Sequence, residues 1–547
     1  MKFSIVLLFL LLCFNKNSYS KSLSNTEKLY ATAKVWGYLK YYHPKVAAGK
    51  FDWDQQLFDI LPIVEKAADK TQLSLLLNGW IASFGKIKSR VKKSSHDYFD
   101  QNFNLAWIED DTYFSDALSA TLKCIETKRH QGNKYYVSYV KGNSGYVKIT
   151  NEKPYQNIAW QKQEYRLLSL FRYWNIIEYF FPHKYQTDKN WDAILIEMIP
   201  KFLNANSEVD YHLAMLSLVA SIDDSHGSFV TPQTFNYFGN KFIPAQISLV
   251  DNKAIITKFR DDSLATVNDL QIGDIITKVN NRFVESIYLE NEQYIMGSNK
   301  PRKMYSSQSF IFKGSSDSLE IEFVRKGISY SKTIKRYPYD QFKKKAVNAV
   351  GFKMLDNNVG YLNLNQITKD EIGSVLQQFS TTKAIIIDIR KKSKGTINII
   401  SDFITTERTD FYSAIAPDLN YPGRFIWNKG YQVGNGEGER YKGKVVLLVN
   451  EGTQSHSEFT AMCLQAGDNV VTVGSQTSGA DGKVSSFEMV GGFKTSFTGY
   501  GIFYPDKTET QRKGIKIDIE LKPTIEGVSN GKDEQLERAI QVANGKK

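Results

Sequence analysis

The sequence predicts a multidomain α/β protein. Its 547 residues are more than one compact domain usually holds. Helical patterns fill the N-terminal part, a strand-rich segment comes next, and from about residue 345 apolar strand-like runs alternate with helical ones. That alternation is typical of a sheet covered by helices. The 42% of hydrophobic residues exclude wholesale disorder, and three cysteines are too few for a disulfide scaffold.

Residues 1–20 have the pattern of a secretory signal peptide. An apolar run covers residues 5–14, and Ser18-Tyr19-Ser20 has the small-x-small form of a cleavage site. The run is too short to span a bilayer, so we expect cleavage after Ser20 and a periplasmic or secreted protein. Cys13 raises a lipoprotein alternative, although Leu12 is larger than the residue that usually precedes a lipidated cysteine.

The formal charge of +12 does not by itself identify a partner. The longest basic clusters, 343–345 and 390–394, are not interleaved with the aromatic residues of nucleic-acid grooves. We therefore expect no nucleic-acid partner. No segment after the leader has about 18 uninterrupted apolar residues, so no stable membrane insertion is expected. Without a His-Glu-x-x-His or Cys-x-x-Cys motif, we expect neither a metal nor another cofactor. The oligomeric state is not predicted.

The N-terminal region contains a duplication. Identical residues recur at one constant offset of 138 positions, which predicts two related helical units at 21–150 and 151–239. In the first unit Leu57, Ile60, Leu61 and Val64 form one apolar stripe of a helix. The matched pairs are Trp36 and Trp174, Tyr41 and Tyr179, Pro44 and Pro182, Trp53 and Trp191, Asp54 and Asp192, Leu57 and Leu195, Pro62 and Pro200, Ala82 and Ala220, and Ser83 and Ser221.

The two units differ where they end. The first ends Ser83-Phe84-Gly85-Lys86-Ile87-Lys88, whereas the second ends Ser221-Ile222-Asp223-Asp224-Ser225-His226-Gly227. A lone histidine is usually structural. One that lies in a polar turn after a helix, and is missing from its duplicate, is a better candidate for chemistry.

Residues 240–338 are predicted to form a β-rich domain. Strand-like runs at 246–250 and 253–258 flank an Asp251-Asn252 turn, and a second pair lies at 318–324 and 329–335. The segment Gly273-Asp274-Ile275-Ile276, which continues to Val279-Asn280, resembles a strand of PDZ domains. This resemblance implies capture of extended or C-terminal peptides by β-augmentation. The peptide-contacting residues would be Phe242, Ile243 and Pro244. The alternative is a β-rich domain without a ligand.

Residues 345–547 contain the segment that is most informative about chemistry. The apolar run Val445–Val449 leads through a tight turn to Ser455, at the start of a predicted helix. A serine there exposes its hydroxyl beside free backbone N–H groups and the positive end of the helix dipole. Ser455 is either a nucleophile or a simple N-cap. The N–H of His456 is a natural oxyanion donor.

The motifs of this region resemble those of the C-terminal processing (tail-specific) peptidases. Gly452-Thr453-Gln454-Ser455-His456-Ser457-Glu458 is similar to the nucleophile motif of that family. With the PDZ-like region, the resemblance covers roughly residues 220–545 and implies a ClpP/crotonase-like α/β core. The other family landmarks occur in order at Gly360–Leu364, Ile386–Arg390, Gly474–Gly479, Gly514–Asp518 and Asp533–Ala539.

The family resemblance offers two candidates for the general base. The commoner branch uses a lysine 25 residues after the serine, where this chain has Ala480. Lys483 could substitute for it only if the loop bulged. The tricorn-like branch instead places a Ser-His pair just before the PDZ domain, and Ser225-His226 occupies that place. Imidazole has a reference pKa near 6.5 and suits this task. The expected catalytic residues are therefore Ser455 and His226, with Ser225 assisting.

Two departures from the family pattern affect the expected site. Where tricorn-like members supply a glutamate, this chain has Gln511, which can orient a partner but carries no charge. The loop that normally supplies the second oxyanion donor reads Lys391-Lys392-Ser393-Lys394-Gly395, which leaves only Gly395 in that pattern. We expect a serine endopeptidase that cleaves polypeptides through an acyl-enzyme. A catalytically inactive peptide-binding protein of the same fold is the alternative.

Overall fold

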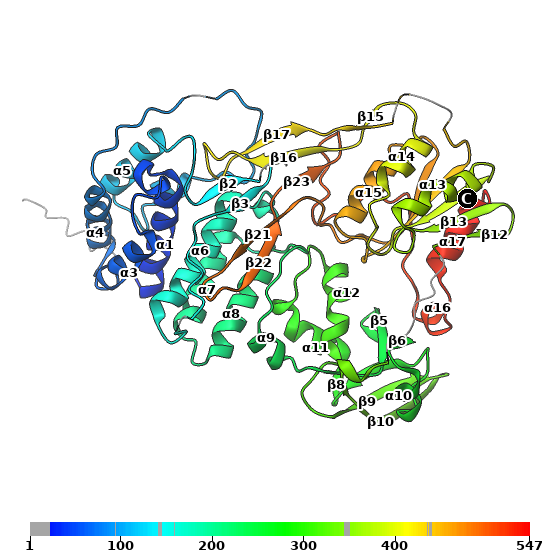
Figure 1. The fold of residues 1–547 in the computed structure, drawn as a ribbon. Helices are drawn as coiled ribbons and strands as arrows, with labels where there is room; N and C mark the ends of the chain where they lie inside the picture. Colours follow the sequence, from blue (N-terminus) through cyan, green and yellow to red (C-terminus); the bar gives the residue numbers. More distant parts are fainter. Residues whose placement is uncertain are drawn as a thin grey trace, which may run out of the picture.

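The computed structural model describes residues 22–546 except 93, 141–144, 158, 344–350, 435 and 437–439. A helical region, a β-rich domain and an α/β core succeed one another along the chain (Figure 1). The predicted signal peptide lies outside the described residues. Among those described, no helix is both long enough and apolar enough to cross a membrane.

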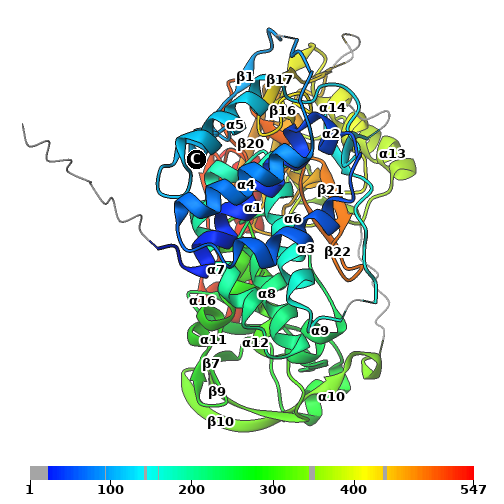
Figure 2. The ribbon, with the colours of Figure 1, turned by 90° about the vertical axis from the view of Figure 1, so that its left-hand side faces the viewer.

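The helical region repeats the same three helices. They are α1 (Asn25–Tyr42), α3 (Trp53–Val64) and α4 (Lys70–Ser83) in the first copy, and α6 (Gln163–Phe180), α7 (Trp191–Leu203) and α8 (Glu208–Ala220) in the second. Each helix of the second copy starts 138 residues after its counterpart, which is the offset of the sequence repeat. The duplicated helical region is therefore present in the fold (Figure 2).

Local capping and tryptophan packing explain why both copies form. Five of the six helices have a side-chain N-cap, at Ser24, Asp52, Asp69, Asn190 and Ser207. The indoles of Trp36 and Trp53 each donate to the other's backbone carbonyl at 3.1 Å. Trp174 and Trp191 do the same at 2.8 and 3.1 Å. The same four hydrogen-bonding groups thus recur at the same offset.

The two copies pack against each other around α1 and α6. A Cβ atom at Gly37 would lie 1.7 Å from the side chain of Asn175, its counterpart in the second copy, so only glycine permits this approach. Arg172 pairs with Asp54 at 2.8 Å, and the equivalent Lys34 pairs with Asp192 at 2.5 Å. Each copy therefore supplies a cation to the aspartate of the other. The remaining elements of the region are α2 (Pro44–Ala47), β1 (Tyr98–Phe99), η1 (Ala106–Glu109), α5 (Asp116–Thr127), β2 (Val137–Tyr139), β3 (Val147–Ile149), η2 (Lys184–Gln186) and α9 (Pro232–Tyr237).

The β-rich domain is built on a six-stranded sheet in the order β10-β9-β7-β6-β5, with β8 paired to β7. The four predicted strand runs are confirmed as β5, β6, β9 and β10. Alternate residues such as Leu319, Ile321 and Phe323 face a small core of their own. The elements are β4 (Lys241–Phe242), β5 (Ala245–Val250), β6 (Lys253–Phe259), α10 (Asp262–Val267), β7 (Ile275–Val279), β8 (Arg282–Phe283), α11 (Val284–Asn291), η3 (Glu292–Tyr294), α12 (Lys300–Ile311), β9 (Ser318–Arg325), β10 (Ile328–Lys335), β11 (Tyr337–Pro338) and η4 (Tyr339–Gln341).

The α/β core contains a second six-stranded sheet, in the order β12-β13-β14-β19-β20-β24. All of its pairs are parallel except the antiparallel edge pair β12–β13. The sheet is formed by β12 (Phe352–Leu355), β13 (Val359–Asn363), β14 (Ala384–Asp388), β19 (Lys444–Val449), β20 (Val470–Gly474) and β24 (Ile519–Glu520). Its helices are α13 (Lys369–Phe379), α14 (Ile397–Ile404), α15 (His456–Leu464), α16 (Ile525–Ser529) and α17 (Glu534–Ala543).

Helices cover both faces of this sheet, which explains why its strands read as continuous apolar runs. Ile385 and Ile387 of β14 face the cluster that contains α13, α14 and α15. Ile386, between them, faces the cluster that contains α17. The predicted alternation of strands and helices is confirmed.

Segments of the α/β core that lie outside its six-stranded sheet pack against the helical region. The hairpin of β21 (Val484–Glu488) and β22 (Lys494–Thr498) contributes Phe487 and Phe497 to the hydrophobic core of the N-terminal helices. Strand β1 of the helical region in turn pairs with β17. The two regions are therefore interleaved. The other strands of the core outside the six-stranded sheet are β15 (Thr409–Asp410), β16 (Ser413–Pro417), β17 (Phe425–Lys429), β18 (Gln432–Val433) and β23 (Gly501–Phe503).

Candidate active site

Ser455 lies on a sharp turn between β19 and α15. Its backbone has φ 57° and ψ −124°, a left-handed conformation that is costly for a residue other than glycine. Ser455 occupies the N-cap position of α15, and its side chain is half-buried. Strain of this kind is stored in turns that expose a nucleophilic hydroxyl at the end of a strand.

The strained turn is held by the buried carboxylate of Glu458. One oxygen accepts from Thr477 Oγ1 at 2.6 Å and from the N–H of Gly479 at 2.7 Å. The other accepts from the N–H groups of Ala480 at 3.0 Å and Ser455 at 3.1 Å. Burial raises the pKa of Glu458, although these four hydrogen bonds oppose the rise. Glu458 therefore fastens the 477–480 loop to the start of α15.

His226 lies in the turn after α8, and one contact brings this turn to the nucleophile. The side-chain amide of Gln454, the residue before Ser455, donates to the carbonyl of Ser225 at 3.1 Å. The structure thus places the two predicted catalytic segments next to each other, although they are 229 residues apart in sequence. No hydrogen bond joins His226 to Ser455 in the described part of the chain.

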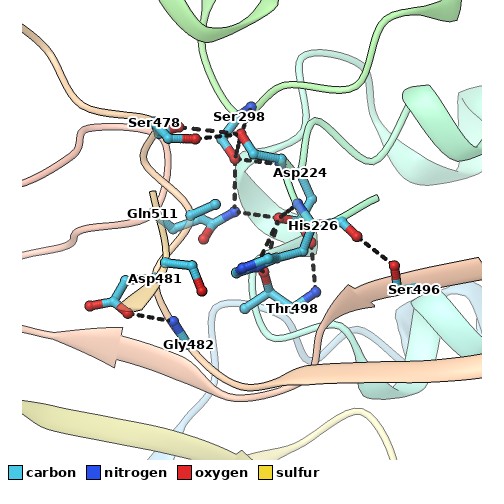
Figure 3. Close-up of polar contacts among 12 residues, drawn as sticks. Asp224, His226, Ser298, Ser478, Asp481, Gly482, Ser496, Thr498 and Gln511 are labelled. Carbon is cyan, nitrogen blue, oxygen red and sulfur yellow. Dashed lines mark hydrogen bonds and ion pairs between the residues drawn. The ribbon is translucent and has the colours of Figure 1, made fainter. Parts of the chain in front are cut away.

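The imidazole of His226 is almost enclosed, with 7% of the side chain exposed. Its Nδ1 atom lies 2.8 Å from Thr498 Oγ1 and 3.9 Å from the carboxylate of Asp224 (Figure 3). Its Nε2 atom is buried and has no hydrogen-bond partner among the described residues. Burial lowers the pKa of His226, the charge of Asp224 raises it, and Arg302 lowers it further. The neutral imidazole is therefore the favoured form.

Asp224 is fully buried beside this histidine. Its Oδ1 accepts from Thr498 Oγ1 at 2.9 Å and from the N–H of His226 at 3.1 Å, and its Oδ2 accepts from the N–H of Thr498 at 2.6 Å. Gln511 lies on the other side of Asp224, with its Nε2 3.4 Å from Oδ1 and 3.5 Å from Ser298 Oγ. Gln511 thus contacts the carboxylate and makes no hydrogen bond to the imidazole in the described structure.

Ser225 belongs to a hydroxyl cluster. Its Oγ lies 3.0 Å from Ser298 Oγ and accepts from Ser478 Oγ at 2.9 Å. Its backbone N–H donates to Ser298 Oγ at 2.8 Å. These contacts fix the His226 turn to the β-rich domain on one side and to the 477–480 loop on the other.

Of the two predicted oxyanion residues, His456 lies at the N-terminus of α15 and Gly395 lies in the loop before α14. His456 is the first residue of the helix, so its N–H is outside the intrahelical ladder. The loop before α14 is tied to the same turn, because Ser457 Oγ accepts from the N–H of Ser393 at 3.0 Å and donates to the carbonyl of Lys391 at 3.2 Å. Gly395 is exposed in this loop with φ 73°.

Several buried polar atoms on residues of these segments and their neighbours have no hydrogen-bond partner among the described residues. Such atoms are rare in native proteins and mark catalytic or binding sites when they gather in one place. The unpartnered atoms here are His226 Nε2, Arg302 Nε, His456 Nε2, Asp481 Oδ2 and Gln511 Oε1.

A groove on the β-rich domain lies between β5 and α12. Its cavity of about 320 Å³ is lined by Phe242 and Ile243 and by the basic side chains of Arg260, Arg302 and Lys313. The third predicted peptide-contacting residue, Pro244, is buried and is not part of this lining. Arg302 also donates to the carbonyl of Glu451 at 3.2 Å, so the groove adjoins the nucleophile turn.

The alternative base, Lys483, is exposed. Its ammonium group lies over the rings of Tyr146 and Tyr500, at 5.6 and 5.4 Å from their centroids. Within the described residues, no group of three His, Cys, Asp or Glu side chains is arranged to hold a metal ion.

Sequence reasoning did not identify Asp224 and Thr498 as parts of the site. Asp224 stands two residues before His226 in the turn that distinguishes the second copy, so the local sequence did contain a signal. Thr498 had no such signal, because it reaches His226 from a hairpin 272 residues later.

Residues 358–521 match Peptidase family S41. No curated protein sequence matches the chain. The crystal structure of mature CPAF is 13% identical, with 70% of this chain and 98% of that chain covered and a TM-score of 0.57. The structure of mature CPAF complexed with lactacystin gives a TM-score of 0.56 at 13% identity, with 70% and 99% covered. The photosystem II D1 C-terminal processing protease is 17% identical, with 67% and 98% covered and a TM-score of 0.40. The family match covers residues 358–521 and agrees with the predicted family there, and the multidomain α/β fold class is confirmed.

Proposed function

We propose that the chain, whose residues 358–521 match Peptidase family S41, is an exported serine peptidase of the tail-specific type that cleaves polypeptides with Ser455 as nucleophile and His226 as base. The observation that carries this assignment is the hydrogen bond from Gln454 to Ser225, which brings the histidine turn to the strained serine turn. The buried Nε2 of His226, unpartnered among the described residues, supports the same assignment.

The proposed reaction proceeds through an acyl-enzyme. Ser455 Oγ attacks the peptide carbonyl carbon while His226 Nε2 takes the hydroxyl proton. The oxyanion that forms accepts from the N–H of His456, and Gly395 is the candidate for a second donor. The C–N bond then breaks, and the imidazolium donates the proton taken from Ser455 to the leaving amine. A water molecule then attacks the ester of the acyl-enzyme while His226 takes a proton from it. The ester C–O bond breaks, which releases the second product and regenerates Ser455.

The groove beside α12 is proposed to capture the substrate. In PDZ-like capture, an extended peptide adds to β5 and its end enters the cavity bounded by Phe242 and Ile243. The basic side chains Arg260 and Lys313 line that cavity and favour a terminal carboxylate or an acidic peptide end. The contact between Arg302 and Glu451 joins this groove to the nucleophile turn, so a captured peptide would lead towards Ser455.

Export is proposed from the predicted signal peptide at residues 1–20 and gives a periplasmic or secreted enzyme. The N-terminal sequence of the mature protein tests this proposal. A chain that begins at Lys21 supports it, and an intact Met1 contradicts it.

An inactive peptide-binding protein is the competing function. It is favoured by Gln511, which carries no charge, by Ala480 in the place of a lysine, and by the lack of a hydrogen bond between His226 and Ser455 in the described structure. Both candidate functions use the groove, and they differ only in whether Ser455 acts as a nucleophile.

A serine-directed fluorophosphonate separates the two functions. Active enzyme should label once per chain, Ser455→Ala should abolish both labelling and cleavage of an unfolded protein, and the exposed control Ser486→Ala should change neither. Absence of labelling in the folded wild-type protein would favour the binding protein. Labelling that persists in Ser455→Ala would show that the nucleophile is wrongly assigned.

A further inference from the structure

We infer that Asp224 and Thr498 form a hydrogen-bond relay that positions His226 as the base. The inference rests on the proposed peptidase function and adds two residues to it. It starts from a juxtaposition of two segments distant in sequence. The turn after α8 supplies Asp224 and His226, and the end of β22 supplies Thr498 (Figure 3).

The relay is required because the acid and the imidazole do not touch. Asp224 Oδ1 lies 3.9 Å from His226 Nδ1, which is too long for a hydrogen bond. The Thr498 hydroxyl bridges that gap, at 2.9 Å from the carboxylate and 2.8 Å from Nδ1. The bridging hydroxyl is fully buried, so water does not compete for it.

The hydrogen-bond donors around Asp224 and Thr498 then fix the tautomer of His226. Asp224 receives two backbone N–H groups, from His226 and Thr498, in addition to the Thr498 hydroxyl. A carboxylate surrounded by donors is an acceptor only. The single proton of Thr498 Oγ1 therefore points to Asp224, and the oxygen can only accept from His226. Nδ1 must carry the proton, and Nε2 is left with the free lone pair that a general base needs.

The relay also supplies the negative charge that Gln511 lacks. When Nε2 takes the proton from Ser455, the resulting imidazolium lies in a nearly dry site. The Asp224 charge stabilises it through the polarised Thr498 hydroxyl. Gln511 Nε2, 3.4 Å from Asp224 Oδ1, helps hold the carboxylate in place. Asp224 and Thr498 are thus positioning residues, because neither needs to touch the substrate.

Thr498→Val tests the relay, with Thr498→Ser as the matched control. Valine has the shape of threonine but no hydroxyl, so the backbone N–H to Asp224 is kept while the bridge is lost. We expect the kcat for cleavage and the rate of fluorophosphonate labelling to fall about 10- to 100-fold, part of the 10²–10⁴ that a general base supplies. KM should change little, because the groove is untouched. Thr498→Ser should restore most of the rate.

The outcomes distinguish failure of the relay from failure of the proposed function. If wild-type protein neither labels nor cleaves, the peptidase assignment fails. If wild-type protein is active and folded Thr498→Val keeps the wild-type kcat, the relay is wrong. If Thr498→Ser is as slow as Thr498→Val, the hydroxyl is not the group that matters, and the relay is again wrong.

A second measurement needs neither activity nor a stable valine variant. Nitrogen-15 NMR of histidine-labelled wild-type protein reports which ring nitrogen carries the proton, and the His226 signals are those lost in His226→Gln. We expect the Nδ1–H tautomer at neutral pH. Observation of the Nε2–H tautomer would overturn the relay even if the enzyme is active.

Discussion

The two copies of the helical repeat share a scaffold and differ in the turn that comes after their third helix. Both carry the reciprocal tryptophan hydrogen bonds, and both end in a left-handed residue at the same offset, Gly85 with φ 80° and Asp223 with φ 49°. The first copy packs Phe84 against Trp53 and Trp80. The second copy instead runs into the polar turn that carries His226.

The scaffold and the proposed chemistry therefore depend on separate residues. The left-handed turn is accessible to glycine at no cost and to aspartate at a small one. Aspartate at this place brings polar partners, since Asp223 accepts from Lys303 Nζ at 2.7 Å and from the N–H of Asp188 at 2.8 Å. Those contacts hold the residue at which the turn that carries His226 begins. In the first copy, the equivalent glycine has no side chain to make such contacts.

The largest expected difference between the copies is catalytic. His226→Ala should reduce the rate of fluorophosphonate labelling about 10²- to 10⁴-fold, because it removes the proposed general base. Lys88→Ala, which alters the matched position of the first copy, should leave the rate unchanged. Both variants should remain folded, which thermal unfolding checks. An equal loss of rate in the two variants would remove the functional distinction between the copies.

A smaller effect is expected at the left-handed residue. Asp223→Gly gives the second copy the residue of the first, keeps the backbone turn and removes the buried partner of Lys303. We expect the free energy of unfolding to fall by about 2 kcal/mol, as for other broken buried contacts of a charged group. Denaturant titration measures this change. Asp223→Asn, which keeps an acceptor for Lys303, is the control. A more stable Asp223→Gly protein would show that backbone strain outweighs the ion pair.

The smallest difference is expected in the shared scaffold. Trp36→Phe and Trp174→Phe each remove one indole N–H bond to a buried carbonyl and some packing volume. Each should lower stability by about 1–3 kcal/mol. The two losses should be similar, since the same contacts recur in each copy, and neither change touches the groups of the site. Thermal unfolding of both variants tests this prediction, and a loss confined to one copy would contradict the equivalence of the two scaffolds.

The fold could be predicted from the sequence where the signal was periodic or repeated. The constant offset located the duplicated helices, because a duplication repeats caps and packing residues together. The apolar run Ala384–Ile389 identified a strand buried on both faces. The sequence did not reveal that the β21–β22 hairpin packs into the helical core, since a hairpin pattern does not predict which distant segments the hairpin contacts.

The candidate site was predictable where a motif was local. Ser455 and His226 each stood in a short distinctive segment, and the structure places those segments side by side. Gln511 was expected to orient the site, and its contact is with Asp224. Thr498 could not have been found, because its role depends on a tertiary approach between residues 272 positions apart.

The interleaving of the hairpin with the helices has a consequence for biosynthesis. His226 leaves the ribosome early, whereas Ser455 and Thr498 emerge more than two hundred residues later. The helical region cannot complete its own hydrophobic core until Phe487 and Phe497 arrive on the hairpin. Contacts of such long sequence separation form late and slowly. The proposed catalytic centre is therefore assembled only after the β21–β22 hairpin has been synthesised and has packed against the helices.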